Sequence, residues 1–563
     1  MRITTSDKEH VTTFIHACIR NGMTHVVCSP GSRNSSLVIA IDEHPALETL
    51  VVHDERSAAF YALGIAEELK TPVGMVCTSG SAMLNYYPAV AEAFYQSIPI
   101  VVMSADRPTE WVNHGDGQTI VQEGVYQNHI RYEARISKHQ DASEINSAVD
   151  LAFEAGLNTW KGPIHFNLPL EEPLYGKREV EWEKEAEVDR SIEPFTLNAE
   201  SQEELTKIWD ASPRKMILIG QHYKDLALQN GLFDLCNDSS IAVLVENTSN
   251  LTHQRWVHCI DRTLGGISED EIERYQPDLL ITIGGAVISK RIKQFLRSAP
   301  IKAHWRIGYE FPQMDTYRKL THSFETNPAD FIDVLLSMNL TRNLSNFGST
   351  WKQLDFLNQE KLTTFFETIP YSDMAVFETL LDYIPENAYL HMANSSVVRY
   401  CQLYNPIPSL RYFANRGTSG IDGSTSTACG VALSSPDSCN VLVTGDVSFF
   451  YDTNAFWNKQ ISSNLRVFLI NNGGGGIFRI IPGPRESDQL ENYFEAHHDR
   501  KAEFICKAHD VQYSSASSLD EIESQMANFF EESDRPKLME IFTPRELNGE
   551  VLSNYFDRLK LSK

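Results

Sequence analysis

An acidic residue, two amides and a run of four glycines stand at the ends of two apolar segments in the last third of the chain. NVLVT (440–444) is followed by Gly445 and Asp446, and LRVFLI (465–470) by Asn471, Asn472 and GGGG. Asp446 and Asn472 are 26 positions apart, with a helix-like segment between them. Because neighbouring strand ends lie about 5 Å apart, the Asp446 carboxylate and the Asn472 amide oxygen can reach one ion. Oxygen ligands of this kind suit Mg²⁺, which shares its remaining positions with phosphates.

The position of the glycines at 473–476 predicts a ligand-binding loop and not a flexible linker. They follow one apolar segment directly and precede the apolar pair Ile477 and Phe478. Glycine lets the backbone approach a ligand closely, so amide groups can face a phosphate and a carbonyl can face a metal. A lone Gly-Asp pair is more often a solvated turn with a structural acid. The acid, the amides and the glycine loop together favour a site for a metal and a diphosphate.

The elements that must position these residues alternate between strand-like and helix-like patterns, which is typical of parallel α/β layers. In the first third, LETLVVHDE (47–55) precedes the helical spacing of RSAAFYALGIAEELK (56–70). Ligands of open parallel sheets bind at the carboxyl ends of the strands, where the polar residues of this chain gather. The other strand-like segments of this third are HVVCSPGSR (25–33), TPVGMVCTSGSA (71–82), IPIVVMSADRP (98–108) and KGPIHFNLPLEEP (161–173), the last with the pattern of an edge strand leaving the domain.

Two further α/β units follow a charged stretch, residues 176–200, that lacks apolar periodicity and is predicted to be a linker. The GG pair at 284–285 is a weak dinucleotide signal, and the sequence has no GxGxxG, so no nicotinamide site is expected. The segments of the second unit are KMILIGQ (215–221), SIAVLVENTSN (240–250) and PDLLITIGGAVISKRIKQFLR (277–297), in which the GG pair follows a strand and precedes a helix. The third unit begins near residue 366 and adds NAYLHMANSSVVRY (387–400) and RYFANRGTSGIDGSTSTACGVAL (411–433) to the two segments described first.

Composition excludes several classes of protein. The 563 residues, 42% of them hydrophobic and 22% charged, carry a net charge of −26, so a nucleic-acid or anionic-membrane surface is not expected. The longest charge-free run, Val73 to Ala91, is too polar for membrane insertion. Nine cysteines without a CxxC pair suggest reduced thiols, and no basic-then-apolar leader opens the chain, so a cytoplasmic location is expected.

Several motifs closely resemble the MenD family, the 2-succinyl-5-enolpyruvyl-6-hydroxy-3-cyclohexene-1-carboxylate synthases, which are thiamine diphosphate (ThDP) transferases of menaquinone biosynthesis. The resemblance runs from Pro30 to about Phe478 and is weak in the middle unit. The motifs are SPGSRNSS (29–36), HDER (53–56), TSGSAMLNYYPAVAEA (78–93), ADRP (105–108), GQTIVQ (117–122), NSSVVR (394–399), NRGTSGIDG (415–423) and NNGGGGIF (471–478).

The resemblance implies an α/β fold of three domains, each a parallel sheet flanked by helices. These would be a pyrimidine-binding domain over residues 1–182, a middle domain over 198–350 and a diphosphate-binding domain over 366–563. The cofactor would lie between the first domain of one chain and the third domain of another. A homodimer with active sites at its interface is therefore expected, with a homotetramer as a further possibility.

The resemblance also implies the cofactors, ThDP and Mg²⁺ (or Mn²⁺), and their ligands. Asp446, Asn472 and Gly474 would bind the metal. Glu55 would share a proton with the pyrimidine ring nitrogen and favour the tautomer that generates the carbanion catalyst. Taken alone, Glu55 would be read as an acid at the start of a helix, and the motif at 445–472 favours the functional role. Ile421 would support the bent cofactor, although an ordinary core isoleucine is nearly as plausible. The full set of expected cofactor contacts is Glu55, Ser79, Gly80, Ile421, Gly445, Asp446, Ser448, Asn472, Gly474, Ile477 and Phe478.

The implied reaction is decarboxylation of 2-oxoglutarate and a Stetter-like addition of the succinic semialdehyde carbanion to isochorismate. Both substrates are carboxylates, and arginine suits carboxylates best. Lys290 is the weakest candidate, since Arg291 and Lys293 compete with it. The residues expected to act on the substrates, together with Glu55, are Ser32, Arg33, Arg107, Gln118, Lys290, Ser395, Arg399 and Arg416.

Two other functions are compatible with the sequence, and two positions differ from the pattern of the resembled family. The chain could be another ThDP-dependent 2-oxo acid decarboxylase or carboligase, or a non-catalytic α/β protein with a relic phosphate site. The first has little use for so many arginines, and the second would be expected to have lost Glu55, Asp446 or Asn472. Gly473 stands where many relatives have a third Asn or Asp, and Gly117 where they often have an amide side chain.

Overall fold

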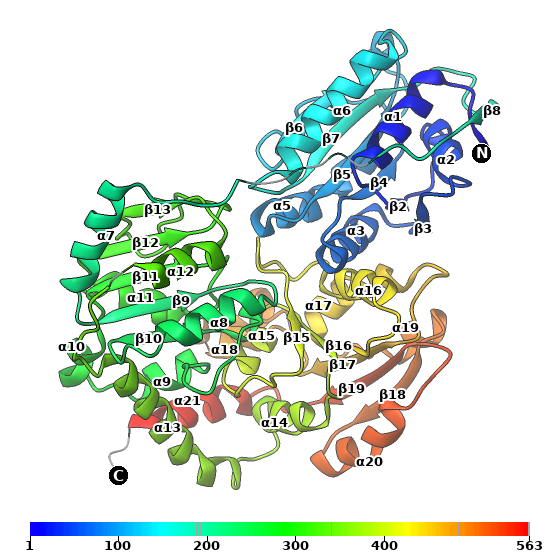
Figure 1. Ribbon diagram of the computed structural model, residues 1–563. Helices are drawn as coiled ribbons and strands as arrows, with labels where there is room; N and C mark the ends of the chain where they lie inside the picture. The colour runs from blue at the N-terminus through cyan, green and yellow to red at the C-terminus, as the bar shows by residue number, and fades with distance from the viewer. Residues whose placement is uncertain (187, 189, 191–192, 339, 481–482, 561–563) are drawn as a thin grey trace.

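Three parallel β-sheets, each flanked by helices, make up the protein in the computed structural model (Figure 1), which confirms the expected fold class. The structure describes residues 1–186, 188, 190, 193–338, 340–480 and 483–560. The first sheet lies at one end of the molecule, and the second and third sheets lie side by side below it in the view of Figure 1.

The first sheet has six parallel strands in the order β3-β2-β4-β5-β7-β6. Strands β4 and β5 are buried along their whole length, as expected for a parallel sheet covered by helices on both faces. The strands are β2 (His25–Cys28), β3 (Glu48–Val51), β4 (Val73–Cys77), β5 (Ile100–Asp106), β6 (Tyr132–Arg135) and β7 (Ile164–Pro169). The helices are α1 (Glu9–Arg20), α2 (Ser35–Ile41), α3 (Glu55–Leu69), α4 (Ser81–Asn85), α5 (Tyr87–Gln96) and α6 (Ala142–Leu157).

The second sheet has five parallel strands in the order β10-β9-β11-β12-β13. Its strands are β9 (Lys215–Ile219), β10 (Ile241–Val245), β11 (Leu279–Ile283), β12 (Ala303–Ile307) and β13 (His322–Phe324). Its helices are α7 (Ala199–Asp210), α8 (Leu226–Leu235), α9 (Ile260–Gly265), α10 (Ile272–Tyr275), α11 (Lys290–Ser298), α12 (Pro328–Ser337) and α13 (Phe347–Phe366).

The third sheet has six parallel strands in the order β15-β14-β16-β17-β19-β18. The strands are β14 (Tyr389–Met392), β15 (Arg411–Phe413), β16 (Asn440–Gly445), β17 (Leu465–Asn471), β18 (Gln512–Ala516) and β19 (Lys537–Phe542). The helices are α14 (Asp373–Tyr383), α15 (Ser396–Cys401), α16 (Ser424–Ser434), α17 (Asp446–Tyr451), α18 (Ile477–Ile480), α19 (Glu503–Ala508), α20 (Leu519–Phe530) and α21 (Leu547–Lys560). Strands β16 and β17 are neighbours, as the spacing of Asp446 and Asn472 predicted.

Helices α3 and α16 join the first and third units through one continuous apolar core (Figure 1). Two glycines allow the close approach. A Cβ at Gly64 would lie 2.2 Å from the Thr427 carbonyl oxygen, and one at Gly430 would lie 2.3 Å from that of Tyr61. A larger residue at either position would force the two helices apart.

Two predictions about the first unit were wrong. Residues 161–173 do not form an edge strand, because β7 lies between β5 and β6. The stretch 176–200 is not entirely a linker, because β8 (Lys177–Glu181) pairs antiparallel with β1 (Arg2–Ser6) in a separate two-stranded sheet. The exposed side chains of Lys177, Glu179 and Glu181 alternate with the half-buried Arg178 and Val180, and because Arg178 is also charged this period of two does not stand out in the sequence.

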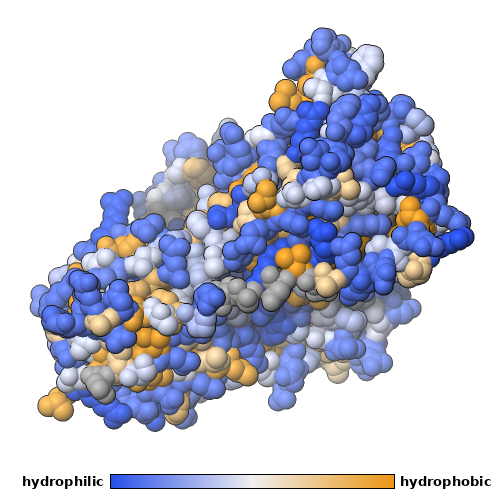
Figure 2. Space-filling model, turned by 45° about the horizontal axis from the view of Figure 1, so that its top comes forward, coloured by the Kyte–Doolittle hydropathy of each residue, from blue (hydrophilic) through white to orange (hydrophobic). Residues whose placement is uncertain are grey.

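Hydrophilic side chains cover most of the face seen in Figure 2, with hydrophobic ones in small separate groups. This surface agrees with the net charge of −26. Among the described residues, no helix combines the length and the apolar composition that crossing a bilayer requires.

Candidate active site

A cavity of about 250 Å³ lies at the carboxyl ends of β14, β16 and β17, the position expected for a ligand of an open parallel sheet. Its walls come from the strand-end loops of the third unit and from helix α14. It brings together eight of the residues singled out in the sequence: Ser395, Ile421, Gly445, Asp446, Ser448, Asn472, Gly474 and Phe478.

Asp446 is one of three buried acids that line this cavity, with Asp373 and Glu495, and it is the first residue of α17. Its Oδ2 accepts the backbone N–H groups of Gly473 and Gly474, each at 2.9 Å, and its Oδ1 accepts that of Val447 at 2.6 Å. Burial raises the pKa of the Asp446 carboxyl to about 7, although these three bonds oppose the shift. The carboxyl is therefore costly to ionise alone, and a bound cation would favour its charged form.

Asn472 supplies an oxygen without a partner beside this acid. Its Nδ2 donates to Oδ2 of Asp373 at 3.1 Å, whereas its buried Oδ1 has no hydrogen-bond partner. Buried amide oxygens usually have a hydrogen-bond partner, and this unpaired one lies in a cavity beside a buried acid, where a cation could bind it. This orphaned oxygen is available as a ligand for a metal ion.

The glycine loop adopts backbone conformations that other residues rarely take. Gly473 has φ +79° and Gly474 φ +148°, and a Cβ at Gly474 would lie 2.6 Å from the Glu495 carbonyl oxygen. A Cβ at Gly476 would lie 2.9 Å from Nδ2 of Asn472. The Gly474 carbonyl accepts Gly476 N–H at 2.9 Å and keeps one lone pair.

The oxygen atoms of Asp446, Asn472 and Gly474 fit a divalent cation that also binds a diphosphate. Among the described residues, no group of three or more His, Cys, Asp or Glu side chains is arranged to hold a metal. Asp373 is engaged with Asn472 and Glu495 with Arg479, so a metal at this cavity would rely on the Asp446 carboxylate with amide and carbonyl oxygens. Hard oxygen ligands in small number suit Mg²⁺ or Mn²⁺ that also binds phosphate.

The apolar residues expected beside the cofactor are partly in place. Ile421 and Phe478 line the cavity, and Ser448 Oγ donates to the Ile421 carbonyl at 2.7 Å, which ties that loop to α17. Ile477 is buried at the start of α18 and is not among the cavity-lining residues.

The residues expected at the pyrimidine lie at strand ends of the first sheet. Glu55 begins α3, with Asp54 capping the helix, and burial raises the pKa of the Glu55 carboxyl above its ordinary value. Gly80 has φ +82°, and its N–H donates to Gln122 Oε1 at 2.9 Å. The neighbouring Ser79 hydroxyl is buried with no hydrogen-bond partner.

Two of the expected arginines form a like-charged pair in the first unit. Arg33 donates to the Leu170 carbonyl at 2.9 Å, and burial followed by the charge of Arg107 lowers its pKa. Arg107 lies 3.6 Å from Asp116. Ser32 and Gln118 are exposed, and Gln118 has φ +56°.

The other two arginines form a second pair beside the cavity. Arg416 donates to Asn394 Oδ1 at 2.5 Å, and burial followed by the charge of Arg399 lowers its pKa. Burial also lowers the pKa of Arg399. Lys290 is exposed at the start of α11. Burial lowers the pKa of Lys293, the charge of Glu246 opposes this shift, and the charges of Arg416 and Arg399 add to it. Of the two lysines Lys290 and Lys293, Lys293 is therefore the one whose pKa is affected by this arginine pair.

Four supporting residues were missed. Asp373 holds Asn472 as described. Asn394 binds the Arg416 guanidinium and the carbonyls of Asn415 and Gly420. Glu92 reaches from α5 to the loop that carries Arg416, and Glu495 pairs with Arg479 at 2.6 Å under the glycine loop. Glu92 and Asn394 stand inside two of the quoted motifs (78–93 and 394–399), whereas Asp373 and Glu495 lie outside every motif and have no local signal.

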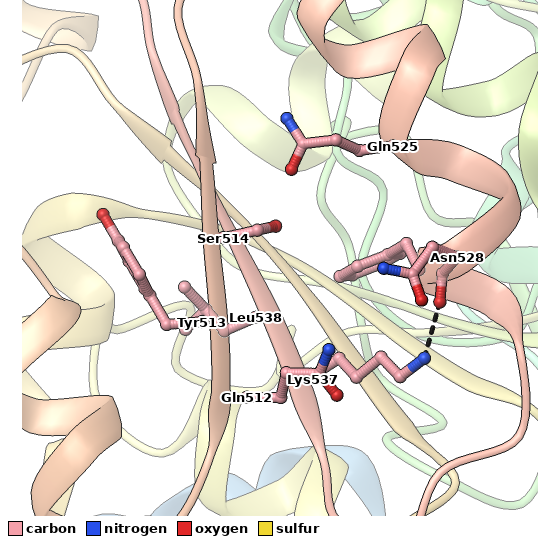
Figure 3. Close-up of a pocket in the computed structure, with 8 residues that line it drawn as sticks. Gln512, Tyr513, Ser514, Gln525, Asn528, Lys537 and Leu538 are labelled. Carbon is pink, nitrogen blue, oxygen red and sulfur yellow. Dashed lines mark hydrogen bonds between the residues drawn. The ribbon is translucent and has the colours of Figure 1, made fainter.

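A second pocket is too small for such a ligand. It lies between β18, β19 and α20, and its volume is about 30 Å³, enough for a water molecule or two. Figure 3 shows Lys537 reaching along this pocket to the Asn528 carbonyl, to which its Nζ donates at 2.5 Å.

Comparisons with known proteins show which enzymes the chain resembles. Residues 9–130 match the thiamine pyrophosphate enzyme, N-terminal TPP binding domain. The chain is 42% identical to the 2-succinyl-5-enolpyruvyl-6-hydroxy-3-cyclohexene-1-carboxylate synthase of Christiangramia forsetii, over 96% of this chain and 97% of that protein. It is 41% identical to the synthase of Flavobacterium psychrophilum, over 97% and 98% of the two chains. For the synthase of Porphyromonas gingivalis the identity is 38%, over 98% and 97%.

Proposed function

Because the chain belongs to the 2-succinyl-5-enolpyruvyl-6-hydroxy-3-cyclohexene-1-carboxylate synthase family of ThDP-dependent enzymes, we propose that it makes this compound from 2-oxoglutarate and isochorismate. The reaction releases CO₂ from 2-oxoglutarate and joins the remaining four-carbon unit to the isochorismate ring. Its place would be in menaquinone biosynthesis.

One observation carries the proposal: the cavity that holds Asp446, the orphaned Asn472 oxygen and the glycine loop. Asp446, Asn472 and the Gly474 carbonyl would hold Mg²⁺ or Mn²⁺, and the loop amides would face the diphosphate. Bound ThDP supplies a nucleophilic carbon and an electron sink for the decarboxylation.

The residues of this chain would hold a proton, exclude water and bind anions. The Glu55 carboxyl, with its pKa raised by burial, can keep its proton at the pyrimidine ring nitrogen. Ile421 and Phe478 would keep water away from the reacting carbon. The two arginine pairs, Arg33 with Arg107 and Arg399 with Arg416, would each receive carboxylates, which relieve the repulsion between their like charges.

The site would be completed by a second copy of the chain. Every residue that lines the cavity in the described part of one chain belongs to the segment from 373 to 496, so Glu55 and Gly80 are not among them. We therefore place the pyrimidine-binding residues of one subunit, within residues 1–182, against the cavity of its partner, within 366–563, with residues 198–350 as the middle domain. The active unit would be a homodimer, which could pair further into a homotetramer.

The test is turnover of both substrates. The protein is incubated with ThDP, Mg²⁺, 2-oxoglutarate and isochorismate, and the absorbance of isochorismate is followed. We expect isochorismate to disappear only when 2-oxoglutarate is present. Release of CO₂ from 2-oxoglutarate with no loss of isochorismate would instead identify a ThDP-dependent decarboxylase or carboligase of another kind.

A further inference from the structure

We propose that Asp373 is a positioning residue that fixes the direction of the Asn472 side-chain amide, so that its oxygen and not its nitrogen faces the metal. The inference rests on the proposed function, because it concerns the metal site described above. It adds a role for a residue that touches no reacting atom.

An asparagine side chain has two similar ends with opposite consequences for a cation. Its oxygen can ligate a metal, whereas its NH₂ group carries positive partial charge and repels one. In this site Asn472 Nδ2 donates to Asp373 Oδ2 at 3.1 Å, which leaves Oδ1 buried and without a partner beside Asp446. A carboxylate oxygen can only accept here, so it selects the nitrogen end of the amide.

Asp373 is itself held in place from three directions. Its Oδ1 accepts the Thr543 hydroxyl at 2.6 Å, and its backbone N–H donates to Asn548 Oδ1 at 2.8 Å. It begins α14, which the Ser372 side chain caps through Ala375 N–H. Thr543 also donates its backbone N–H to the Asn471 carbonyl at 3.1 Å, so the same residue fixes both the acid and the loop.

The packing around the amide leaves Asp373 as the group that decides its direction. Asp373 and Asn472 are 3% and 8% exposed, so bulk water does not compete for the amide. The absence of a Cβ at Gly476 gives the amide its space, since such a Cβ would lie 2.9 Å from Nδ2 and 3.4 Å from Oδ1. Space alone does not distinguish the two ends, whereas the hydrogen bond to Asp373 does.

The experiment measures metal binding and not turnover. Mn²⁺ is titrated in the presence of ThDP and its binding is followed by electron paramagnetic resonance. The variants are Asp373→Ala and Asp373→Asn, and the matched control is Asp382→Ala, at an exposed position on the same helix. We expect Asp373→Ala to weaken Mn²⁺ binding by about 10-fold to 100-fold, the usual effect of losing a residue that orients a ligand. Asp373→Asn keeps an oxygen for Asn472 Nδ2 and should stay within about 3-fold of wild type, as should the control.

A swapped pair covers the case in which Asp373→Ala does not fold. Asp373→Asn with Asn472→Asp keeps the hydrogen bond and the net charge, and it still presents an oxygen to the metal, so we expect Mn²⁺ to bind at least as tightly as in wild type. Unchanged binding in folded Asp373→Ala, or a loss of 10-fold or more in the swapped pair, would overturn the inference. A wild-type protein that binds neither Mn²⁺ nor ThDP would instead overturn the proposed function.

Discussion

Replacing Glu92 by glutamine tests how the first unit holds the loop that carries Arg416 and Ile421. Glu92 is 1% exposed on α5. Its Oε1 accepts Gly417 N–H at 2.7 Å, and its Oε2 accepts both the N–H and the hydroxyl of Thr418 at 2.6 Å. A Cβ at Gly417 would lie 2.5 Å from the Glu92 carbonyl oxygen, so the loop and the helix are in close contact.

The size of the effect follows from the donors that lose their acceptor. Glutamine is nearly isosteric and can keep the bond to Gly417 with its oxygen, but its NH₂ group then faces the Thr418 N–H. One buried N–H left without an acceptor costs about 1–3 kcal/mol. The Thr418 hydroxyl can rotate and accept from the new amide, which limits the loss to that one group. We therefore expect Glu92→Gln to lower the free energy of unfolding by about 2 kcal/mol.

The assay is urea denaturation followed by circular dichroism, with Glu43→Gln as an exposed control in the same unit. A parallel titration of isochorismate should show a raised KM for Glu92→Gln, because the loop that carries Arg416 loses an attachment. Denaturation midpoints and KM values that match wild type would refute the idea that Glu92 holds the loop. Equal losses in the Glu43 control would show that the effect is not specific to the buried contact.

Three further changes test other parts of the structure. Glu67→Gln should stabilise the protein more as pH rises, because burial and then the charge of Glu92 raise the pKa of Glu67 to about 8. The folded wild type keeps a proton that the unfolded chain releases above about pH 4.5. The free energy of unfolding of the wild type therefore falls by up to about 1.4 kcal/mol per pH unit between pH 4.5 and pH 8. Denaturation at pH 5 and 8.5 checks this, and a constant difference would contradict it. Gly430→Ala should lower the unfolding free energy by about 1–3 kcal/mol, since its Cβ would lie 2.3 Å from the Tyr61 carbonyl, and an unchanged midpoint would count against that packing. Glu55→Gln should bind ThDP in calorimetry yet lose most turnover, and full turnover would rule out its proton-holding role.

Spacing along the chain predicted the centre of the site because strand ends have fixed positions. Two strands that are neighbours in a parallel sheet bring Asp446 and Asn472 together however the rest of the chain folds. Asp373 lies 99 positions before Asn472, and only the tertiary packing that brings the start of α14 to the end of β17 makes them meet. Contacts of that kind depend on tertiary packing, which no local pattern encodes.

The wrong edge-strand prediction has a similar cause. Strand β7 contains His165 and Asn167, polar residues that are unusual inside a sheet. Both are satisfied by residues of neighbouring segments: Ser104 Oγ lies 2.7 Å from His165 Nε2 and donates to Asn167 Oδ1 at 3.0 Å, and Glu133 Oε1 lies 3.0 Å from His165 Nδ1. A strand that carries its own polar residues can be central when its neighbours carry the partners, and the sequence of one strand alone does not contain that information.

The four glycines show how one short motif can meet several separate requirements. Gly473 takes φ +79°, a conformation that Asn and Asp also adopt, and a Cβ there would make van der Waals contact with the His498 carbonyl oxygen at 3.4 Å, so its difference from many relatives is compatible with the same backbone. Gly474 takes φ +148° against the Glu495 carbonyl, where no side chain fits. Gly476 leaves room for the Asn472 amide. The run is therefore a loop whose conformation is set residue by residue, and this rigidity lets Asp446 bind two consecutive amides while Asn472 keeps one oxygen free.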